Sequence, residues 1–192
     1  MAPLMAPTGE FIGELAVKDG AEQPRILDIA AGHGPFGISA ARRNPGARIV
    51  ALDWEKVLAV ARENAEAAGV LERYEFLPGD ALTIDYGRGF DVVLVTNCFH
   101  HFDRSACESL MRKMHACLKD GGRVVTLEFI PNEDRVSPPI SAMFSMMMLG
   151  TTPSGDAYTF AEYDEMFQAA GFSRNEFLDV PRSPQQAVVS YR

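Results

Sequence analysis

A glycine-containing loop between a predicted strand and a predicted helix is the first feature of this sequence that could bind a ligand. Residues 27–37 read LDIAAGHGPFG, so Gly32 and Gly34 fall where the strand ends and the helix begins. Glycine permits positive φ angles and lets a ligand approach the backbone closely, and the first amides of a helix point beyond the strand end. We expect both glycines to contact a cofactor; a tight turn alone is the alternative.

Acidic residues near the ends of the first three predicted strands favour the same site. Asp28 lies in the first strand, Asp53 ends the second, and Asp80 follows the third in the sequence LPGDAL. The Asp53 carboxylate can accept hydrogen bonds from both hydroxyls of a ribose, and Asp80 could accept one from an adenine amino group. Each Asp alone could instead cap a helix or close a turn. Their succession predicts a nucleotide-like ligand beyond the carboxyl ends of the strands.

The fourth predicted strand ends in Asn97 and leads into the histidine-containing sequence TNCFHHFD. An imidazole, with an ordinary pKa of about 6.5, can accept a proton at neutral pH. Glu128, at the end of the fifth predicted strand, could hold one imidazole nitrogen. We assign His100 as the catalytic base, Glu128 as its support and Asn97 to the cofactor. The alternatives are a structural histidine and a solvated glutamate.

A metal site is the other interpretation of this segment. His100, His101 and Asp103 are possible ligands, but adjacent residues on a strand point to opposite sides, and the sequence has no matching third cluster. We therefore expect no metal ion. We also expect the side chain of His101 to point away from the cleft.

The alternation of strands and helices predicts a doubly wound α/β fold. Five runs rich in Val, Ile and Leu are separated by helical segments, which indicates a parallel sheet covered on both faces. An antiparallel terminal pair completes a mostly parallel, seven-stranded sheet. The predicted strands are residues 25–30, 48–53, 74–77, 91–97, 123–129, 175–180 and 187–191, and the predicted helices are residues 36–43, 55–68, 104–118 and 159–170.

The chain divides into an N-terminal helix and linker, residues 1–24, and a cofactor-binding catalytic domain, residues 25–192. The N-terminal part contains a short amphipathic helix expected at residues 11–17. Residues 131–157 interrupt the alternation of strands and helices and contain the apolar run MFSMMML at 143–149.

Composition excludes several classes of function. Apolar residues make up 47% of the 192 and charged residues 23%, as in soluble globular proteins, and 18 basic against 26 acidic residues give a net charge of −8. Such a chain lacks the basic face that nucleic acids and anionic membranes require. Its apolar runs are shorter than the roughly 20 residues that cross a bilayer. Three cysteines without a CxxC pair indicate free thiols and a cytoplasmic location.

Taken in order, the motifs LDIAAGHG, ALDW, PGDAL, TNCFHHFD and LKDGGRVVTLEF resemble those of class I S-adenosylmethionine-dependent methyltransferases. More narrowly, they resemble the catalytic domain of the caffeic-acid and hydroxyindole type of O-methyltransferase, over about residues 25–190. The resemblance implies a Rossmann-like fold and S-adenosyl-L-methionine as cofactor. It implies that the loop at Gly32 passes the methionine part, that Asp53 holds the ribose, and that Asp80 and Ala81 lie beside adenine. Trp54 would pack on the adenine or in the core.

Several features depart from that family pattern. Ala30 stands where the family usually has glycine, and His101 replaces an acid. A second carboxylate, expected near Ala157, has only Asp156 as a loose substitute. The N-terminal winged-helix domain through which the family dimerises has no counterpart in residues 1–24, so we expect a monomer or a weak homodimer.

These arguments predict methyl transfer from S-adenosyl-L-methionine to a hydroxyl of a small aromatic or natural-product acceptor, with His100 as general base. The resemblance implies that residues 143–149 line the acceptor pocket, whereas packing on the core is the alternative. Two other functions stay open. Gly32, Gly34 and Gly37 also fit the GxGxxG spacing of an NAD-type oxidoreductase, and a non-catalytic domain could bind cofactor and a partner.

Overall fold

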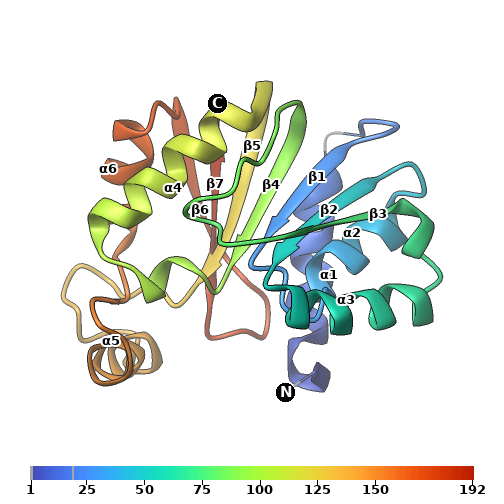
Figure 1. Ribbon diagram of the computed structural model, residues 1–192. Helices are drawn as coiled ribbons and strands as arrows, with labels where there is room; N and C mark the ends of the chain where they lie inside the picture. The colour runs from blue at the N-terminus through green and yellow to red at the C-terminus, as the bar shows by residue number, and fades with distance from the viewer. Residues whose placement is uncertain (1, 19) are drawn as a thin grey trace.

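A computed structural model describes residues 2–18 and 20–192, in which helices pack on both faces of a central sheet (Figure 1). The central parallel strands are short apolar runs, as expected for strands that are buried on both faces. In chain order the elements are α1 (Ala2–Val17), β1 (Arg25–Ile29), α2 (Pro35–Arg43), β2 (Arg48–Asp53), α3 (Glu55–Ala67), the 3₁₀ helix η1 (Leu71–Arg73), β3 (Tyr74–Pro78), β4 (Phe90–Thr96), the 3₁₀ helix η2 (Phe99–His101), α4 (Arg104–Cys117), β5 (Leu118–Glu128), α5 (Pro139–Thr151), α6 (Phe160–Ala169), β6 (Arg174–Asp179) and β7 (Gln186–Tyr191).

Within the described residues, seven strands form one sheet in the order β3-β2-β1-β4-β5-β7-β6. Strands β1 to β5 run parallel, and β7 runs antiparallel to both β5 and β6. This confirms the predicted doubly wound sheet with an antiparallel terminal pair. The strand order reverses at β1, which lies between β2 and β4. Such a switch point opens a crevice beyond the carboxyl ends of the strands, where ligands bind in this type of sheet.

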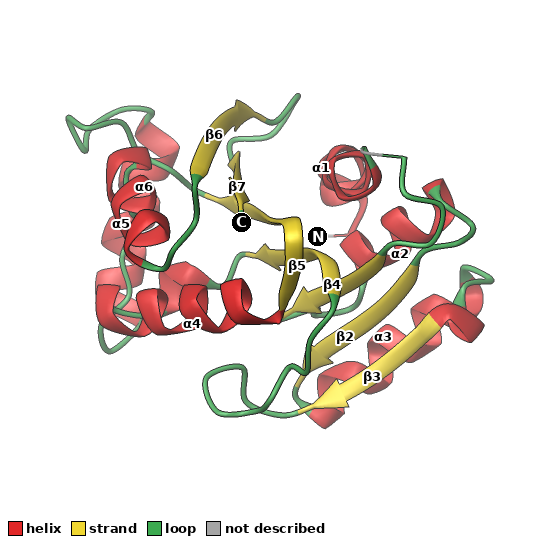
Figure 2. Cartoon of the chain, turned by 90° about the horizontal axis from the view of Figure 1, so that it is seen from above, coloured by secondary structure: helices red, strands yellow, loops and turns green. Residues whose placement is uncertain are grey.

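Two apolar layers join the sheet to its helices. Helices α4 and α6 cover one face, and α1, α2 and α3 cover the other (Figure 2). Because side chains alternate along a strand, Leu27 of β1 faces the first layer, with Phe90 and Tyr163, and Ile26 faces the second, with Phe36. The central strands β1 and β4 are therefore buried on both faces, which fixes the positions of their ends.

Helix α1 extends the helix expected at residues 11–17 back to Ala2 and packs closely on α2. A Cβ atom added at Gly13 would lie 2.3 Å from Ser39 Oγ, so glycine permits this close approach. The guanidinium group of Arg123, in β5, donates a hydrogen bond of 2.7 Å to the carbonyl oxygen of Leu15. This bond satisfies one of the terminal carbonyls of α1.

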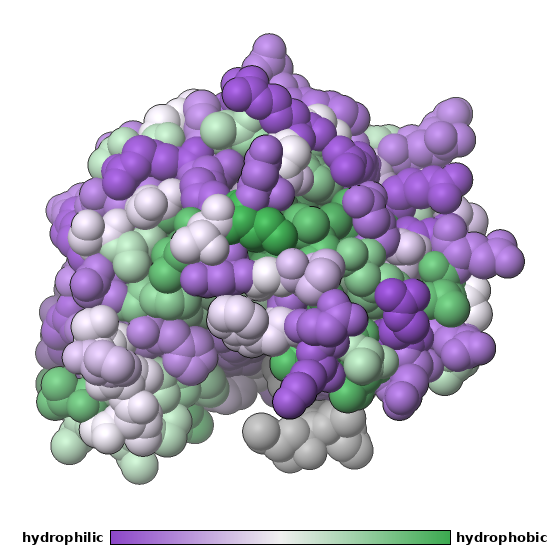
Figure 3. Space-filling view, in the orientation of Figure 1, coloured by the Kyte–Doolittle hydropathy of each residue, from purple (hydrophilic) through white to green (hydrophobic). Residues whose placement is uncertain are grey.

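Two parts of the second half differ from the sequence prediction or add to it. β5 begins at Leu118 and not at residue 123, because a register irregularity lets Leu118 pair with Phe90 before the regular pairing resumes at Val92 and Arg123. The segment 131–157, whose secondary structure the sequence left open, contains α5. This helix exposes Met146 and Leu149, at 74% and 81%, and green atoms mark its region in Figure 3.

The helix predicted after this segment begins with a capping box, in which Thr159 is the N-cap. The side chain of Thr159 accepts a hydrogen bond from the backbone N–H of Glu162, and the Glu162 carboxylate accepts one from the N–H of Thr159. Among the described residues, no helix is both long and apolar enough to cross a membrane.

Candidate active site

A cavity of about 300 Å³ lies beyond the carboxyl ends of the central parallel strands, and this volume is within the range of small-molecule sites. Of the residues predicted to bind the cofactor, its lining contains Asp53, Trp54, Asp80, Ala81 and Asn97. The other lining residues, for which the sequence predicted no cofactor role, are Ala30, Leu52, Gly79, Cys98, His101 and Phe102. Most of them lie next to a predicted site residue in the sequence, and this adjacency is the only feature of the sequence that could have indicated them.

The glycine loop is joined to this cavity through Ala30 and Asp53, whereas Gly32 and Gly34, both predicted to contact the cofactor, are not among the residues that line it. Gly32 and Gly34 have φ angles of 59° and 86°, in the left-handed region that glycine adopts without steric cost. The N–H of Gly32 donates a hydrogen bond of 2.9 Å to Oδ2 of Asp53, so the loop is tied to the end of β2. Ala30 has a φ angle of 54° and itself lines the cavity. The alanine thus occupies the glycine conformation with a strained backbone.

Asp28 does not line the cavity, contrary to its assignment as a cofactor residue. Its side chain is fully buried, and its Oδ2 accepts a 3.1 Å hydrogen bond from the backbone N–H of Gly37, in the first turn of α2. Burial raises the pKa of Asp28 to about 7; the N–H of Gly37 acts against this shift and the charge of Asp53 adds to it. Asp28 therefore positions the start of α2.

Asp53, Trp54 and Asp80 form the polar and aromatic part of the cavity wall. Oδ1 of Asp53 accepts a hydrogen bond of 2.7 Å from the N–H of Trp54, and Oδ1 of Asp80 accepts one of 2.9 Å from the N–H of Leu82. These bonds fix the directions of both carboxylates. The indole ring of Trp54 is 61% exposed, so its placement in the core is wrong.

This set of donors and acceptors fits S-adenosyl-L-methionine. Each oxygen of an ionised carboxylate can accept more than one hydrogen bond, so Asp53 retains capacity for ribose hydroxyls and Asp80 for an amino group. An exposed indole offers a flat face for an adenine ring. The backbone of Asn97 has a φ angle of 53°, and its side-chain oxygen accepts a hydrogen bond from Gln185, which fixes the amide at the rim of the cavity.

His100 and Glu128 are in direct contact next to this cavity. Nδ1 of His100 lies 2.6 Å from Oε2 of Glu128, and the two residues are 6% and 1% exposed. The other carboxylate oxygen, Oε1, accepts hydrogen bonds of 2.8 and 2.9 Å from the N–H groups of Cys98 and Phe99. Glu128 thus holds both the backbone at the start of η2 and the imidazole ring, and its interpretation as a solvated residue is wrong.

His101 lines the cavity, so its predicted outward direction is wrong. The two histidines belong to the 3₁₀ helix η2 and not to a strand, and their ring centroids lie 4.2 Å apart. Burial lowers the pKa of His101, and the proximity of His100 lowers it further. Within the described part of the chain, no three His, Cys, Asp or Glu side chains form a group that could hold a metal ion.

Helix α5 approaches the histidine through a single aromatic side chain. The ring of Phe144 meets that of His100 edge-on at 4.8 Å and stacks on that of Phe129 at 4.3 Å. Asp156, the loose substitute for a second carboxylate, accepts hydrogen bonds from Ser145 at 2.5 Å and from Arg135 at 3.1 Å. Its carboxylate therefore ties α5 to the neighbouring loop.

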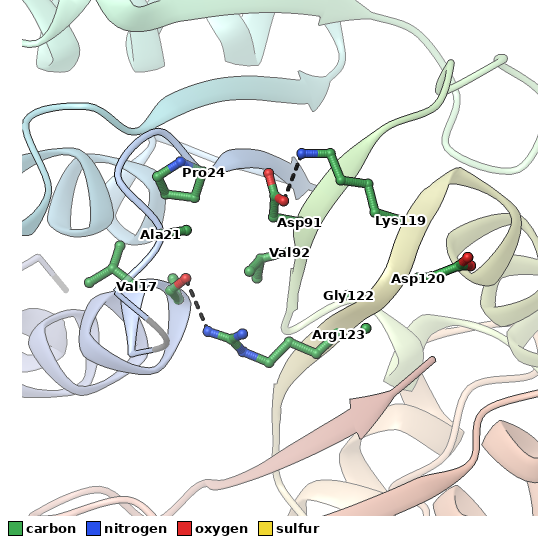
Figure 4. A pocket seen from close by; sticks show the side chains of 11 residues that line it. Val17, Ala21, Pro24, Asp91, Val92, Lys119, Asp120, Gly122 and Arg123 are labelled. Carbon is green, nitrogen blue, oxygen red and sulfur yellow. Dashed lines mark hydrogen bonds and ion pairs between the residues drawn. The ribbon is translucent and has the colours of Figure 1, made fainter.

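Another, smaller cavity of about 150 Å³ lies at the opposite ends of the parallel strands, near the amino ends of β4 and β5 (Figure 4). Lys119 donates a 2.7 Å hydrogen bond to Asp91 there, and Arg123 points to the end of α1. None of the residues predicted to bind cofactor or catalyse is part of its lining. The switch-point cavity is therefore the candidate active site of an α/β nucleotide-cofactor-binding domain.

Comparisons with known proteins define the family. The family described as the O-methyltransferase domain matches residues 14–173. The chain is 31% identical over 150 residues to 3-hydroxy-5-methyl-1-naphthoate 3-O-methyltransferase of Streptomyces sahachiroi, covering 78% of this chain and 43% of that protein. A crystal structure of a provisionally assigned O-methyltransferase from Nostoc punctiforme is 48% identical, with a TM-score of 0.95, and the match covers 100% of this chain and 58% of that one.

A structure of PigF with S-adenosylhomocysteine is also similar, at 25% identity and a TM-score of 0.85 over 100% of this chain and 56% of that one. PigF of Serratia sp. (strain ATCC 39006) is an S-adenosyl-L-methionine-dependent methyl transferase. The chain thus belongs to the family of S-adenosylmethionine-dependent O-methyltransferases, which confirms the predicted resemblance. It spans about half the length of the curated relatives it matches.

Proposed function

We propose that this chain transfers a methyl group from S-adenosyl-L-methionine to a hydroxyl of a small aromatic acceptor, with His100 as general base. The observation that carries this proposal is the buried contact between His100 and Glu128 beside the cavity that contains Asp53. The naphthoate O-methyltransferase to which the chain is similar supports an aromatic acceptor.

In this proposal, the residues that line the cavity bind and orient the cofactor. Asp53 accepts hydrogen bonds from the ribose hydroxyls, Asp80 and Ala81 lie beside the adenine, and Trp54 packs on the adenine ring. When bound, S-adenosyl-L-methionine supplies an electrophilic methyl group on a positively charged sulfur. Much of the rate acceleration is expected from holding the acceptor oxygen in line with that methyl group.

His100 takes the acceptor proton. A phenol is a weak nucleophile and its phenolate a strong one, so a base within reach of the hydroxyl assists transfer. The Glu128 carboxylate accepts a hydrogen bond from Nδ1, which leaves Nε2 of the neutral ring as the basic nitrogen. Glu128 also stabilises the imidazolium that forms when Nε2 receives the proton.

Calorimetry with S-adenosylhomocysteine and with NAD separates the two enzyme classes. We expect S-adenosylhomocysteine to bind and NAD not to bind; binding of NAD alone would reject the proposal. Incubation with methyl-labelled cofactor and a panel of phenols, naphthols and aromatic amines then tests the acceptor. Label on a phenolic or naphtholic oxygen supports O-methylation of an aromatic hydroxyl. Cofactor binding without transfer to any acceptor would favour the non-catalytic alternative.

A further inference from the structure

A lysine outside the cavity holds the loop that forms one of the cavity walls. Lys113, on α4, donates hydrogen bonds from Nζ to the carbonyl oxygens of Ala81, Leu82 and Ile84, at 2.7, 2.9 and 2.9 Å. These carbonyls belong to the loop between β3 and β4, residues 79–89. An ammonium group has three N–H donors, so the loop carbonyls use all of them.

Tyr86 completes this arrangement from within the loop. Nζ of Lys113 lies 4.3 Å from the centroid of the Tyr86 ring, in cation–π geometry. The Tyr86 hydroxyl, on a residue only 5% exposed, donates a 2.6 Å hydrogen bond to the Ala81 carbonyl that Lys113 also contacts. The loop therefore wraps around the ammonium group on several sides, with carbonyl dipoles that point toward the positive charge.

The same loop carries cofactor-side residues. Gly79, Asp80 and Ala81 line the candidate cavity, whereas Lys113 does not. The Ala81 backbone is thus shared, because its carbonyl faces Lys113 and the residue itself faces the cavity. Without the ammonium group, the carbonyls of Leu82 and Ile84 would lose this donor and that of Ala81 would keep only the Tyr86 hydroxyl, so the loop would have to rearrange to solvate them.

We propose that Lys113 is a positioning residue for the cofactor: its ammonium group fixes the loop 79–89 and, through it, the side chain of Asp80. This inference rests on the proposed function, because it assigns Asp80 and Ala81 to the adenine side. It concerns binding of the cofactor and not the chemical step, since His100 and Glu128 are held by other contacts.

The test compares Lys113→Met with Lys119→Met. Both substitutions remove an ammonium group and keep an unbranched side chain, but Lys119 pairs with Asp91 near the amino ends of β4 and β5, away from the candidate cavity. Hydrogen exchange of residues 79–89 is measured in the free protein, and the Kd of S-adenosylhomocysteine by calorimetry. We expect faster exchange of this loop and a Kd raised on the order of 10- to 100-fold, as displaced binding groups produce, in Lys113→Met alone. Turnover at saturating cofactor should stay near the wild-type value.

Unchanged loop exchange in Lys113→Met would overturn the inference, and so would faster exchange with an unchanged Kd. Lys113→Arg is the second variant, because it keeps the charge if the methionine variant does not fold. Its planar guanidinium group cannot direct three N–H groups from one nitrogen, so its Kd should also rise; a wild-type Kd would overturn the inference. A wild-type protein that does not bind S-adenosylhomocysteine would instead defeat the proposed function, and the exchange measurement would still decide whether Lys113 holds the loop.

Discussion

Nδ1 of His100 and Oε2 of Glu128 lie 2.6 Å apart although 28 positions separate the two residues in the chain. The contact exists because β4 and β5 are parallel neighbours, so that their carboxyl ends open into the same crevice. Both side chains are buried, and the carboxylate is also bound to the backbone of η2. The imidazole is therefore held in one orientation before any acceptor binds.

Replacement of His100 by alanine should lower the rate of methyl transfer by roughly 10²- to 10⁴-fold, the usual contribution of a general base. Cofactor affinity should change little, because His100 does not line the cavity that contains Asp53. Single-turnover transfer to an accepted phenol, together with calorimetry of S-adenosylhomocysteine, measures the two effects separately. A wild-type rate in His100→Ala would leave proximity alone to explain the transfer.

The controls for this experiment follow from the structure. His101 is unsuitable, because it lines the cavity. His115, whose ring packs on Phe172 at 5.1 Å, is the matched histidine, and His115→Gln should retain the wild-type rate. In Glu128→Gln, the side-chain amide oxygen can still accept hydrogen bonds from the two backbone N–H groups. The amide NH₂ group then faces Nδ1 of His100 and donates to it. The proton would then move to Nε2, so the loss should approach that of His100→Ala, and a near-wild-type rate would contradict the assigned tautomer.

Substitution of Asp53 by alanine should weaken cofactor binding by about 1.5–3 kcal/mol, the scale of a charge-assisted hydrogen bond. The variant also frees the N–H groups of Gly32 and Trp54, so part of the loss comes from the protein's own hydrogen bonds. A 2′-deoxy analogue of S-adenosylhomocysteine separates this part from the ribose contact: if Asp53 holds that hydroxyl, the effects of the substitution and of the missing hydroxyl should not add. Calorimetric affinities that add fully would reject the ribose contact.

The sheet was predictable because most of its strands can be recognised from their own residues. Apolar runs of Val, Ile and Leu that end near Gly, Asp or Asn predicted β1, β2 and β4 to within a residue at each end. Turn and cap residues did the same for α2, α3, α4 and α6, whereas the start of α1 and the whole of α5 were not predicted. These signals are local, so a single sequence contains them.

The direction of individual side chains was harder to predict because tertiary contacts set it. Asp28 and Asp53 both lie near the carboxyl end of a strand. The Asp28 carboxylate is nevertheless buried against the start of α2, whereas Asp53 lines the cavity. The predicted direction of His101 assumed that side chains alternate there as in a strand. The residue instead belongs to a 3₁₀ helix, whose first N–H donates a hydrogen bond to Glu128. Lys113 contacts carbonyls about 30 residues away in sequence. The residues next to it in the sequence give no signal of these contacts.

Replacement of Ala30 by glycine should stabilise the protein. A non-glycine residue in the left-handed region, where Ala30 has a φ angle of 54°, costs about 1–2 kcal/mol. Part of that is offset because glycine gains entropy in the unfolded chain, so a net increase of about 0.5–1 kcal/mol in the free energy of unfolding is expected. Urea unfolding measures it. The neighbour Ala31 is buried and has an ordinary φ angle, so Ala31→Gly should destabilise; equal losses in both variants would contradict the strain argument.

Stability should depend on pH through Asp28. Burial raises its pKa from 3.8 to about 7, so the folded state binds the proton more tightly than the unfolded state does. The stability contributed by the protonated carboxyl is therefore fully present below pH 3.8 and is lost as pH rises through about 7. Asp28→Asn keeps an oxygen for the N–H of Gly37 and removes the titration. Across that range, the wild type should lose up to about 4 kcal/mol in the free energy of unfolding relative to the variant. Urea unfolding of both proteins at several pH values tests this, and two parallel stability curves would mean that folding does not shift the pKa of Asp28.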